Sequence, residues 1–399
     1  MKILLINKFL YPKGGSETYV LALGRHLQER GHQIEYFGME DPQRIVGNRV
    51  NAYVRPIDYH NSTVLGLLRG GLVAVYSPEA RKKLRLVLED FQPDVCHLNN
   101  FHYQLTPAIL LEIRKWCRDS GKNCRILYTA HDSQLVCPNH LMRNPNTDEN
   151  CSKCLQGNFV HCVKGKCIHG SLLRSLLGAL DGWYWNRRKI YRYLDTIIVP
   201  SRFLARQLSA NPLLREKIVV LPNFISREPR KHEKKEDYIL YFGRYSKEKG
   251  IETLLKAIDA LPQIPFVFAG DGPLKGEIGK RENILDRGFL SGLELQETIA
   301  KARFSVVPSE CFENCPYSVL ESLLLGTPVL GADIGGIPEL ISPGKTGELF
   351  ESGNIDQLVQ KIKALWQDPD RLLQYRETCK TATVLTPRQY CEILENQYQ

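Results

Sequence analysis

Two glutamates, Glu313 and Glu321, lie eight positions apart in the largely apolar stretch SECFENCPYSVLESLLLG, residues 309–326. Because glutamate is rarely buried without a partner, the pair indicates either a half-exposed helix with solvated acids or a surface that faces a polar ligand. Pro316 suits the first turn of a helix, and Gly326 suits its C-terminal cap. Glu313 is then expected in the loop before this helix, and Glu321 one to two turns inside it.

The start of that helix is predicted to bind an anion. The free backbone amides of Cys315, Tyr317 and Ser318 would lie at the positive end of the helix dipole. A phosphate bound to these amides would leave Glu321 to accept hydrogen bonds from a ribose and Glu313 to accept them from a sugar. The expected ligand therefore carries both phosphate and sugar groups.

Other candidate residues follow predicted strands. Arg244 and Lys249, in YFGRYSKEKG, are two cations that suit a diphosphate. Gly272 lies in the tight loop FAGDGPL, and Gly14–Gly15 follow the first strand, where a backbone without side chains can approach a phosphate closely. His131 lies just past another strand, in YTAHDSQ. Taken singly, each residue has an ordinary structural explanation, such as an ion pair with a neighbouring acid; together they indicate a binding site.

These residues depend on regular elements for their position, and short apolar runs alternate with helical periodicities along the chain. The predicted strands cover residues 2–7, 33–37, 95–98, 125–129, 196–199 and 218–221 in the first half, and 238–242, 266–269, 304–307 and 328–332 in the second. The predicted helices include residues 17–30, 252–260, 293–302 and 316–325. This alternation predicts two α/β domains with doubly wound parallel sheets, whose ligand sites lie at the carboxyl ends of the strands.

The composition is that of a globular protein, with 43% hydrophobic and 24% charged residues, and the length of 399 residues predicts two domains. The charged segment SREPRKHEKKEDY, residues 226–238, separates the two series of strands and is the expected boundary. The net charge of +9 fits either a solvated basic surface or an anionic partner. No apolar run approaches the roughly 20 residues that a transmembrane helix needs.

Two common nucleotide-binding classes do not fit. A nicotinamide-dependent oxidoreductase should carry G-x-G-x-x-G after its first strand, but residues 7–19 read NKFLYPKGGSETY. A P-loop hydrolase needs G-x-x-x-x-G-K-[ST]; the sequence PGKT at 343–346 supplies the end of that motif, but its first position holds Glu339 instead of glycine. A module that binds a nucleotide sugar without turning it over stays open.

The sequence resembles glycosyltransferase family 4, the retaining nucleotide-sugar glycosyltransferases of GT-B fold, in a bacterial subgroup with a cysteine-rich insertion. Its motifs occur in that family's order: GG near the start, PDVCHLN, YTAH, VPS, GR…KG, GDGP, PSE…ENCPYSVLE and GGIPE. The resemblance covers most of the chain, and the E-x7-E spacing is the family's signature. One departure is ENCP, where many members carry Glu-Gly-Phe-Gly, and this leaves the donor sugar less defined.

The resemblance implies two Rossmann-like doubly wound domains that face a cleft. Residues 1–228 would form an acceptor-side domain that carries the cysteine-rich insertion at 137–167 and is completed by the C-terminal helix at 387–399. Residues 229–386 would form the nucleotide-sugar-binding domain.

The resemblance also implies roles for individual residues. Arg244 and Lys249 would neutralise the donor diphosphate, Glu321 would bind its ribose, and Glu313 would contact the sugar hydroxyls. Because His131 would lie near the reaction centre, the expected catalytic residues are His131, Glu313, Arg244 and Lys249. The expected donor-binding residues are Gly14, Gly15, Arg244, Lys249, Gly272, Glu313, Asn314, Cys315, Pro316, Tyr317, Ser318 and Glu321.

The implied reaction moves a hexose or N-acetylhexosamine from a nucleotide-diphosphate sugar to a hydroxyl of a glycan or lipid-linked acceptor, in the synthesis of bacterial cell-surface polysaccharide. The acceptor hydroxyl would attack from the side of the leaving group, and the departing phosphate would take its proton. Arg244, Lys249 and the helix amides would stabilise the leaving diphosphate, so no catalytic metal is expected. The protein is expected in the cytoplasm, peripheral to the inner face of the plasma membrane in one interpretation, and without a nucleic-acid partner.

Five of the twelve cysteines gather in residues 137–167. The C-x-x-C at 151–154 has the spacing of a metal knuckle, four thiolates fit a closed tetrahedral zinc site, and a metal would stabilise a segment with so little apolar content. Because the chain opens with a strand and not a secretory leader, reduced thiols are expected; free cysteines or a disulfide pair remain alternatives, and an iron–sulfur cluster fits less well. The predicted structural-zinc ligands are four of Cys137, Cys151, Cys154, Cys162 and Cys167, with His140, His161 and His169 as substitutes.

The stretch at residues 171–195 combines leucines at helical spacing with Trp183, Tyr184 and Trp185. Four cations follow, and they are Arg187, Arg188, Lys189 and Arg192. An interfacial membrane helix needs this combination, which predicts an anionic membrane surface as partner and places Trp183 and Trp185 at headgroup depth. A core-facing amphipathic helix of the first domain explains the same pattern equally well.

Overall fold

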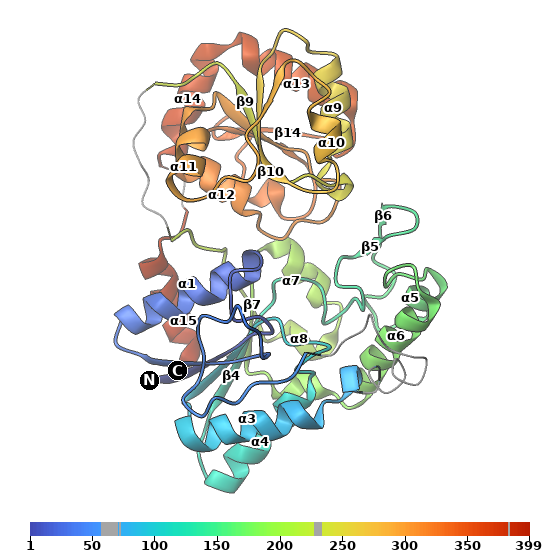
Figure 1. The fold of residues 1–399 in the computed structure, drawn as a ribbon, viewed down its shortest axis with the longest axis vertical. Helices are drawn as coiled ribbons and strands as arrows, with labels where there is room; N and C mark the ends of the chain where they lie inside the picture. Colours follow the sequence, from blue (N-terminus) through green and yellow to red (C-terminus); the bar gives the residue numbers. More distant parts are fainter. Residues whose placement is uncertain (57–70, 72, 227–233, 382–383) are drawn as a thin grey trace. The chain divides into compact units, whose positions relative to one another are not determined.

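The computed structural model describes residues 1–56, 71, 73–226, 234–381 and 384–399 of the chain (Figure 1). The contacts between residues divide the chain into two α/β units. Unit 1 comprises Met1–Pro222 and Pro387–Gln399, and unit 2 comprises Asn223–Thr386. The division falls shortly before the predicted boundary at residue 228, and residues 227–233 of the predicted linker lie outside the described residues.

Unit 1 is built on a sheet of six parallel strands in the order β2-β1-β3-β4-β7-β8. The strands are β1 (Lys2–Ile6), β2 (Gln33–Phe37), β3 (Val95–Leu98), β4 (Arg125–Thr129), β7 (Thr196–Val199) and β8 (Ile218–Val220), and they confirm the strands predicted from the sequence. Both faces of β3 and β7 are buried, which explains why these strands are largely apolar. Strand β2 pairs with one edge of β1, and β3 pairs with the other edge. The direction of the strand order therefore reverses between β1 and β3, which is the switch point of this sheet.

Helices pack on this sheet: α1 (Gly15–Glu29), α3 (Pro78–Phe91), α4 (Ala108–Ser120), α6 (Leu172–Arg187), α7 (Arg202–Leu208), α8 (Pro212–Arg215) and α15 (Pro387–Tyr398). Serine caps begin three of them, because the hydroxyls of Ser77, Ser171 and Ser201 accept backbone N–H groups of the following turn. Each such cap contributes about 1 kcal/mol to helix stability. The core beneath includes the large rings of Trp116 and Trp185.

Between β4 and β7 the chain inserts a long segment with little regular structure before α6. It contains a short antiparallel ladder of β5 (Arg143–Asn144) with β6 (Glu149–Asn150), and the helix α5 (Val160–Lys164), which packs on α6. The hydrophobic cluster of this insertion is small, and its buried members are Cys154, Phe159, Cys162 and Ala179.

The C-terminal helix α15 belongs to unit 1 and lies beside α1 (Figure 1). Buried hydrogen bonds tie it to the sheet. The hydroxyl of Tyr390 lies 2.7 Å from that of Tyr19, which lies 3.4 Å from Thr129 Oγ1. His97 completes the chain, with Nε2 2.7 Å from Thr129 Oγ1 and Nδ1 2.8 Å from the Tyr398 hydroxyl. Because these groups are buried, the loss of one partner would leave another with an unmet hydrogen bond.

An ion pair holds the same helix at the surface. Arg30 of α1 donates two hydrogen bonds to Glu395, at 2.6 and 2.7 Å, and His32 Nε2 lies 2.9 Å from the same carboxylate. The hydrogen bond from Arg30 holds the pKa of Glu395 at about 2, against the opposing effect of burial. The carboxylate therefore stays ionised well into the acid range, and so does its pair with Arg30.

Unit 2 has a second sheet of six parallel strands, in the order β11-β10-β9-β12-β13-β14. The strands are β9 (Ile239–Arg244), β10 (Phe266–Asp271), β11 (Ile284–Asp286), β12 (Phe304–Val307), β13 (Val329–Ala332) and β14 (Gly347–Phe350). Four of them confirm the prediction. The edge strands β11 and β14 were not predicted, because their sequences, ILD and GELF, contain no apolar run.

The helices of unit 2 are α9 (Ile251–Asp259), α10 (Lys275–Ile278), α11 (Gly292–Lys301), α12 (Tyr317–Leu324), α13 (Ile355–Gln367) and α14 (Pro369–Cys379). The predicted helices correspond to α9, α11 and α12, each displaced by about one residue at its ends. After β9 the chain continues to β10 on one side of the sheet, and after β12 it continues to β13 on the opposite side. The switch point of this sheet therefore lies between β9 and β12.

Buried histidines should make the stability of unit 1 depend on pH. Burial lowers the pKa of His97 and of His102 to about 3, against an ordinary value near 6.5. Both side chains are neutral in the folded state and gain a proton only on unfolding once the pH falls below 6.5. The free energy of unfolding should therefore fall by roughly 1.4 kcal/mol per pH unit for each histidine as the pH falls from 6.5 towards 3.

Urea titrations at several pH values, followed by tryptophan fluorescence, check this expectation, since three of the four tryptophans lie in unit 1. His97→Gln keeps a donor and an acceptor but cannot take up the proton, so its unfolding free energy should vary less steeply with pH. His169→Gln is the control, because His169 is exposed. If the pH dependence of the unfolding free energy changed equally in both variants, the role of burial would be contradicted.

Candidate donor and acceptor sites

The residues predicted to bind a donor in unit 2 gather at the carboxyl edge of its sheet. Arg244 is the last residue of β9, and Lys249 ends the 3-10 turn that follows it (Lys247–Lys249). Glu313 lies in the loop after β12, the strand next to β9. The switch point of a parallel sheet is where ligands bind in folds of this kind, and it brings these three residues to one place.

Lys249 and Glu313 form an ion pair, with Lys249 Nζ 2.5 Å from Glu313 Oε1. Ser309 donates a hydrogen bond to the same carboxylate oxygen at 2.8 Å. Burial would lower the pKa of Lys249, but Glu313, with smaller contributions from Cys311 and Glu248, raises that pKa above its ordinary value. The lysine is therefore a cation near neutral pH, with Glu313 as its counterion.

The loop GGIPE, after β13, fixes the backbone of Glu313. The N–H of Gly336 donates to the carbonyl oxygen of Glu313 at 2.6 Å. Gly335 has a φ of +62°, and a Cβ at this position would lie 2.4 Å from the same carbonyl oxygen. Only glycine satisfies both the left-handed backbone and this close approach. The loop after one strand therefore positions a carboxylate in the loop after another.

Arg244 and Gly272 lie at the ends of neighbouring strands, β9 and β10, which pair in register up to Asp271 and Arg244. The side chain of Arg244 is exposed, and it forms no salt bridge with any residue that the structure describes. Gly272 approaches the next loop so closely that a Cβ would lie 2.5 Å from the carbonyl oxygen of Tyr245. Arg244 is thus available to an anionic ligand, beside backbone that carries no side chain.

Helix α12 begins at Tyr317, and Pro316 is its N-cap. This corrects the predicted start, which had Pro316 in the first turn: the proline has an extended ψ of 128°, so it precedes the helical backbone. Its carbonyl accepts the N–H of Val319 at 3.1 Å. The amides of Tyr317 and Ser318 lie in the first turn, at the positive end of the helix dipole.

Three other predicted donor-binding residues lie on either side of this helix start. Asn314 is half-buried and Cys315 is buried in the preceding loop, where the Cys315 carbonyl accepts a hydrogen bond from the Asn223 side chain at 3.4 Å. Glu321 lies in the second turn of α12 and is half-buried. Glu313 and Glu321 therefore come from a loop and a helix, as predicted, and do not share one helical face.

In unit 1 the carboxyl edge of the sheet gathers His131 and three asparagines. His131 follows β4, and its Nε2 lies 2.9 Å from Oδ1 of Asn99, which follows β3. Asn7 follows β1, and its Oδ1 accepts the N–H of Asn100 at 3.0 Å. Burial lowers the pKa of His131 to about 4, more than Asp132 raises it. The imidazole is therefore neutral near pH 7 and acts as a hydrogen-bonding group.

Gly14 is the N-cap of α1, and Gly15 is its first residue. A buried acid, Glu17, lies in the same turn and accepts a hydrogen bond from the Asn7 side chain at 3.3 Å. Burial lowers the pKa of Lys8, against the raising effect of Glu17. These neighbours and Asn99 were not predicted, although the sequence signals them with polar pairs directly after buried strands: NK after β1 and NN after β3.

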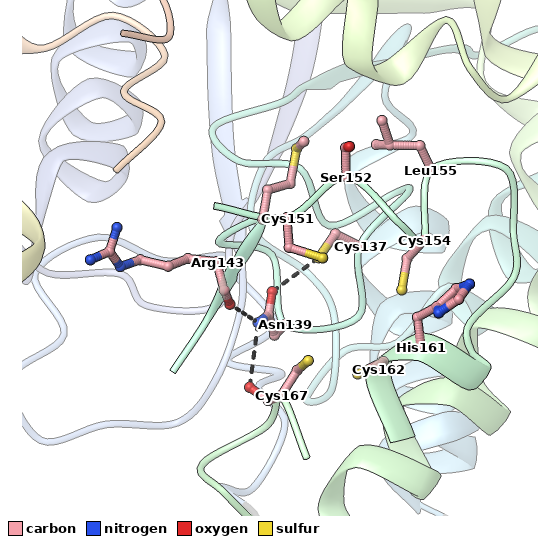
Figure 2. Close-up of a pocket in the computed structure, with 11 residues that line it drawn as sticks. Cys137, Asn139, Arg143, Cys151, Ser152, Cys154, Leu155, His161, Cys162 and Cys167 are labelled. Carbon is pink, nitrogen blue, oxygen red and sulfur yellow. Dashed lines mark hydrogen bonds between the residues drawn. The ribbon is translucent and has the colours of Figure 1, made fainter. Parts of the chain in front are cut away.

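The predicted metal ligands line one small cavity in the insertion of unit 1 (Figure 2), and they are Cys137, Cys151, Cys154, Cys162 and Cys167. Three of the thiols are buried, two are half-buried, and none is in a disulfide. Asn139 stands in the wall, where its Oδ1 accepts a hydrogen bond from the Cys137 thiol at 2.9 Å and its side-chain nitrogen donates to the Arg143 carbonyl at 2.6 Å.

Helix α6 has one face in the core and one in solvent. Trp185, predicted at headgroup depth, is fully buried, and its indole N–H donates to the Val75 carbonyl at 3.0 Å. The prediction is wrong for this ring, because the indole packs in the core of unit 1. Four leucines on the helix are between 37% and 56% exposed, and they are Leu172, Leu173, Leu176 and Leu180. Within the described ranges, no helix combines the length and apolar character needed to cross a bilayer.

Two parallel α/β units, each with polar groups at its switch point, form the GT-B fold of glycosyltransferases. The family described as Glycosyltransferase Family 4 matches residues 13–228, and the family described as Glycosyl transferases group 1 matches residues 223–382. Because the first match covers more than half of the chain, the chain belongs to glycosyltransferase family 4.

Relatives in this family differ in specificity. The chain is 34% identical over 202 residues to sulfoquinovosyl transferase SQD2 of Arabidopsis thaliana, a match that covers 45% of this chain and 39% of that protein. It is 23% identical over 367 residues to N-acetyl-alpha-D-glucosaminyl L-malate synthase of Bacillus anthracis, covering 88% and 86%. The chain spans between 39% and 57% of the length of three relatives, SQD2 among them.

Solved structures share the fold over nearly the whole chain. Sucrose-phosphate synthase of Thermosynechococcus elongatus has a TM-score of 0.69 at 17% identity and covers 100% of this chain and 98% of its own. HepE of Anabaena, in complex with UDP, has a TM-score of 0.68 at 16% identity and covers 99% of both chains. At these identities the likeness establishes the fold.

A pair of glycine substitutions should reveal how strongly the GGIPE loop positions Glu313. Gly335 and Gly344 both have positive φ, +62° and +74°, but a Cβ meets the Glu313 backbone only at the first position and nothing within 4 Å at the second. Each alanine costs about 1–2 kcal/mol for its backbone, and Gly335→Ala should add a displacement of Glu313. We expect Gly335→Ala to melt at a lower temperature than Gly344→Ala and to bind nucleotide more weakly. Equal melting temperatures and nucleotide affinities for the two variants would contradict this account.

Proposed function

We propose that the protein is a retaining glycosyltransferase that moves a sugar from a nucleotide-diphosphate sugar to a hydroxyl of an acceptor. The observation that carries the proposal is the cluster at the switch point of unit 2. There the exposed Arg244, the Lys249–Glu313 pair and the start of α12 lie at the carboxyl ends of β9 and β12. Cations and helix amides suit a diphosphate, and membership of the family supports the assignment.

Donor binding in this proposal exchanges the partner of Lys249. A diphosphate that attracts the lysine releases Glu313, whose carboxylate then accepts hydrogen bonds from the sugar hydroxyls. Ser309, which donates to the same carboxylate oxygen, keeps Glu313 oriented during the exchange. The cation passes from one anion to another and keeps a counterion, while hydrogen bonds from Ser309 and from the sugar hydroxyls would satisfy the released Glu313 carboxylate.

The proposed chemistry follows from the same charges. Breaking the bond between sugar and phosphate leaves negative charge on the nucleoside diphosphate, which Arg244, Lys249 and the α12 amides would stabilise without a divalent metal. The acceptor hydroxyl attacks on the face from which the diphosphate leaves, and the departing phosphate takes its proton. His131 in unit 1 is neutral near pH 7 because burial lowers its pKa to about 4, so its role would be to hydrogen-bond a sugar hydroxyl.

The remaining predicted donor residues serve binding in this scheme. Glu321, in the second turn of α12, would accept hydrogen bonds from the ribose. Gly272, close to the Tyr245 backbone, would leave room for the nucleotide beside Arg244. In unit 1, the N-terminus of α1 at Gly14 and Gly15 would offer backbone amides to a phosphate.

The substrate classes are inferred from relatives. HepE structures contain UDP or UDP-glucose, and other relatives are a sulfoquinovosyl transferase and an alpha-D-kanosaminyltransferase. We infer a hexose or a substituted hexose such as N-acetylhexosamine as the donor sugar. WaaB is a lipopolysaccharide outer core galactosyltransferase, and TuaC of Bacillus subtilis is named for teichuronic acid biosynthesis. These names favour a bacterial cell-surface glycan, or its lipid-linked precursor, as the acceptor.

A lipid-linked acceptor would require unit 1 to reach a membrane, and we propose that α6 provides the contact. Its exposed leucines form an apolar face, and Val160 of the adjoining α5 is 39% exposed. Exposed cations lie at the C-terminal end of the helix and just beyond it, and they are Arg187, Arg188, Lys189 and Arg192. Apolar and basic groups together suit the anionic headgroup region on the cytoplasmic side of a plasma membrane.

The donor site predicts a large loss of activity from small changes. Arg244→Ala and Lys249→Ala should each reduce transfer by about 10²–10³-fold, because each removes charge aimed at the leaving diphosphate. Turnover with a panel of nucleotide sugars, varied separately in base and in sugar, measures the effect. Lys280→Ala, an exposed lysine of unit 2 that pairs with Glu277, is the control and should keep full activity.

Near-normal turnover in both variants would rule out this donor site. Melting curves accompany the assay, since Lys249→Ala also leaves Glu313 without its cation. Tight donor binding by the unmodified protein, with no product from any lipid or sugar acceptor, would instead favour a module that binds nucleotide sugars without turnover.

The membrane contact gives a separate prediction. Replacing the four cations after α6 with glutamine should release the protein from vesicles that contain anionic lipid, because each contributes roughly 1 kcal/mol near such a surface. The matched control replaces four other exposed cations of unit 1 with glutamine, and they are Lys82, Lys115, Arg118 and Lys122. Co-sedimentation at low salt measures binding; equal release by both sets, or no binding by the unmodified protein, would exclude α6 as the contact.

A further inference from the structure

The cysteine cavity of the insertion lies outside the donor cluster of unit 2 and the polar groups around His131, and it is too small for an organic ligand. Its volume is about 20 Å³, which suits one water molecule or one ion. Its other lining residues are Asn139, Met142, Arg143, Ser152, Leu155 and His161. Five thiols around a space of this size form the sulfur-rich surroundings that zinc favours.

Three separate segments of the chain supply these thiols (Figure 2). Cys137 lies in the loop after β4, a turn carries Cys151 and Cys154, and Cys162 and Cys167 belong to α5 and the residues that follow it.

Backbone strain is concentrated in the same segment. Of the ten non-glycine residues with positive φ in the described chain, five lie in the insertion, and they are His140, Met142, Asp148, Lys166 and His169. Such conformations cost of the order of 1 kcal/mol each and persist only where surrounding contacts enforce them. The small apolar cluster of the insertion provides few contacts that could enforce these conformations. A cross-link between the three segments would account for their persistence.

We propose that this cavity binds one structural zinc ion through four of its five cysteines, as thiolates in a closed tetrahedral site. Each thiol that binds gives its proton to solvent, and no electron is transferred. Among the described residues, no three Cys, His, Asp or Glu side chains yet converge at ligand distance. Binding therefore requires the thiols to turn about their side-chain torsions into the cavity.

Zinc at this site would also steady the loop that carries His131. His140 lies in the turn that begins at Cys137, with its N–H donating to the Cys137 carbonyl at 2.9 Å. The ring of His140 lies 3.4 Å from the carboxylate of Asp132, the residue after His131. A metal that fixes the Cys137 turn thus restrains the chain on the carboxyl side of β4.

Metal analysis of the full chain tests the proposal without reference to activity. Protein purified in reducing buffer with zinc supplied should contain about one zinc per chain, with zinc–sulfur distances near 2.3 Å by X-ray absorption. Chelation should lower the melting temperature, and added zinc should restore it. Cobalt substituted for zinc should give the intense visible bands of a tetrahedral thiolate site.

Single Cys→Ser variants then identify the ligands. Four of the five replacements should weaken or abolish zinc binding, and one should leave it unchanged. Cys117→Ser, in α4 and outside the cavity, is the control. Unmodified protein without zinc would overturn the proposal, and so would pairs of thiols lost to disulfides, or zinc retained in full by all five Cys→Ser variants. Because the unmodified protein is measured first, a variant that fails to fold does not decide the outcome.

Discussion

The candidate donor-binding groups of unit 2 and the polar groups around His131 in unit 1 depend on one constraint: the parallel strands of a sheet all end at the same edge. A polar side chain placed directly after a buried strand must therefore lie beside the polar side chains that follow the neighbouring strands. Lys249 and Glu313 are 64 positions apart in the chain, yet they meet because β9 and β12 are adjacent. His131 meets Asn99 for the same reason in unit 1, where β3 and β4 are adjacent.

The Lys249–Glu313 pair shows how a partly buried charge can favour function over stability. Removing two charges from water costs free energy that their attraction recovers only in part, so a pair of this kind is weak support for a stabilising role. The ion pair is better explained by ligand binding. A lysine held by one anionic partner is already charged and in place, and it can exchange that partner for the phosphate of a ligand. Arg244 needs no such partner, since its guanidinium is exposed and remains hydrated.

Much of this arrangement could be predicted because buried parallel strands are mostly apolar runs, and ligand residues follow such runs. The predictions failed where that signal is weak. The edge strands β11 and β14 are short and lack apolar runs, and Pro316 fits either the cap or the first turn of a helix. Asn99 is a different case: it is a polar residue after a strand, but the sequence alone does not identify His131 as its partner. The spacing of the cysteines predicted a cluster, whereas the choice of four from five depends on side-chain torsions that spacing does not determine.

Helix α6 shows why its sequence supported two interpretations equally well, a helix at a membrane surface and a core-facing amphipathic helix. A helix normally has one apolar face, directed to the core, and one polar face, directed to water. In α6 the buried Trp185 accounts for the core-facing side, while the leucines remain exposed on another. A helix that is apolar on two sides needs two apolar partners, and the core of unit 1 is only one of them. In the membrane contact proposed above, an anionic surface would be the partner of the second side, and the neighbouring cysteine segment packs against the same helix. A rigid cross-link in that segment would therefore hold the exposed face of α6 in a fixed orientation, which a surface contact requires.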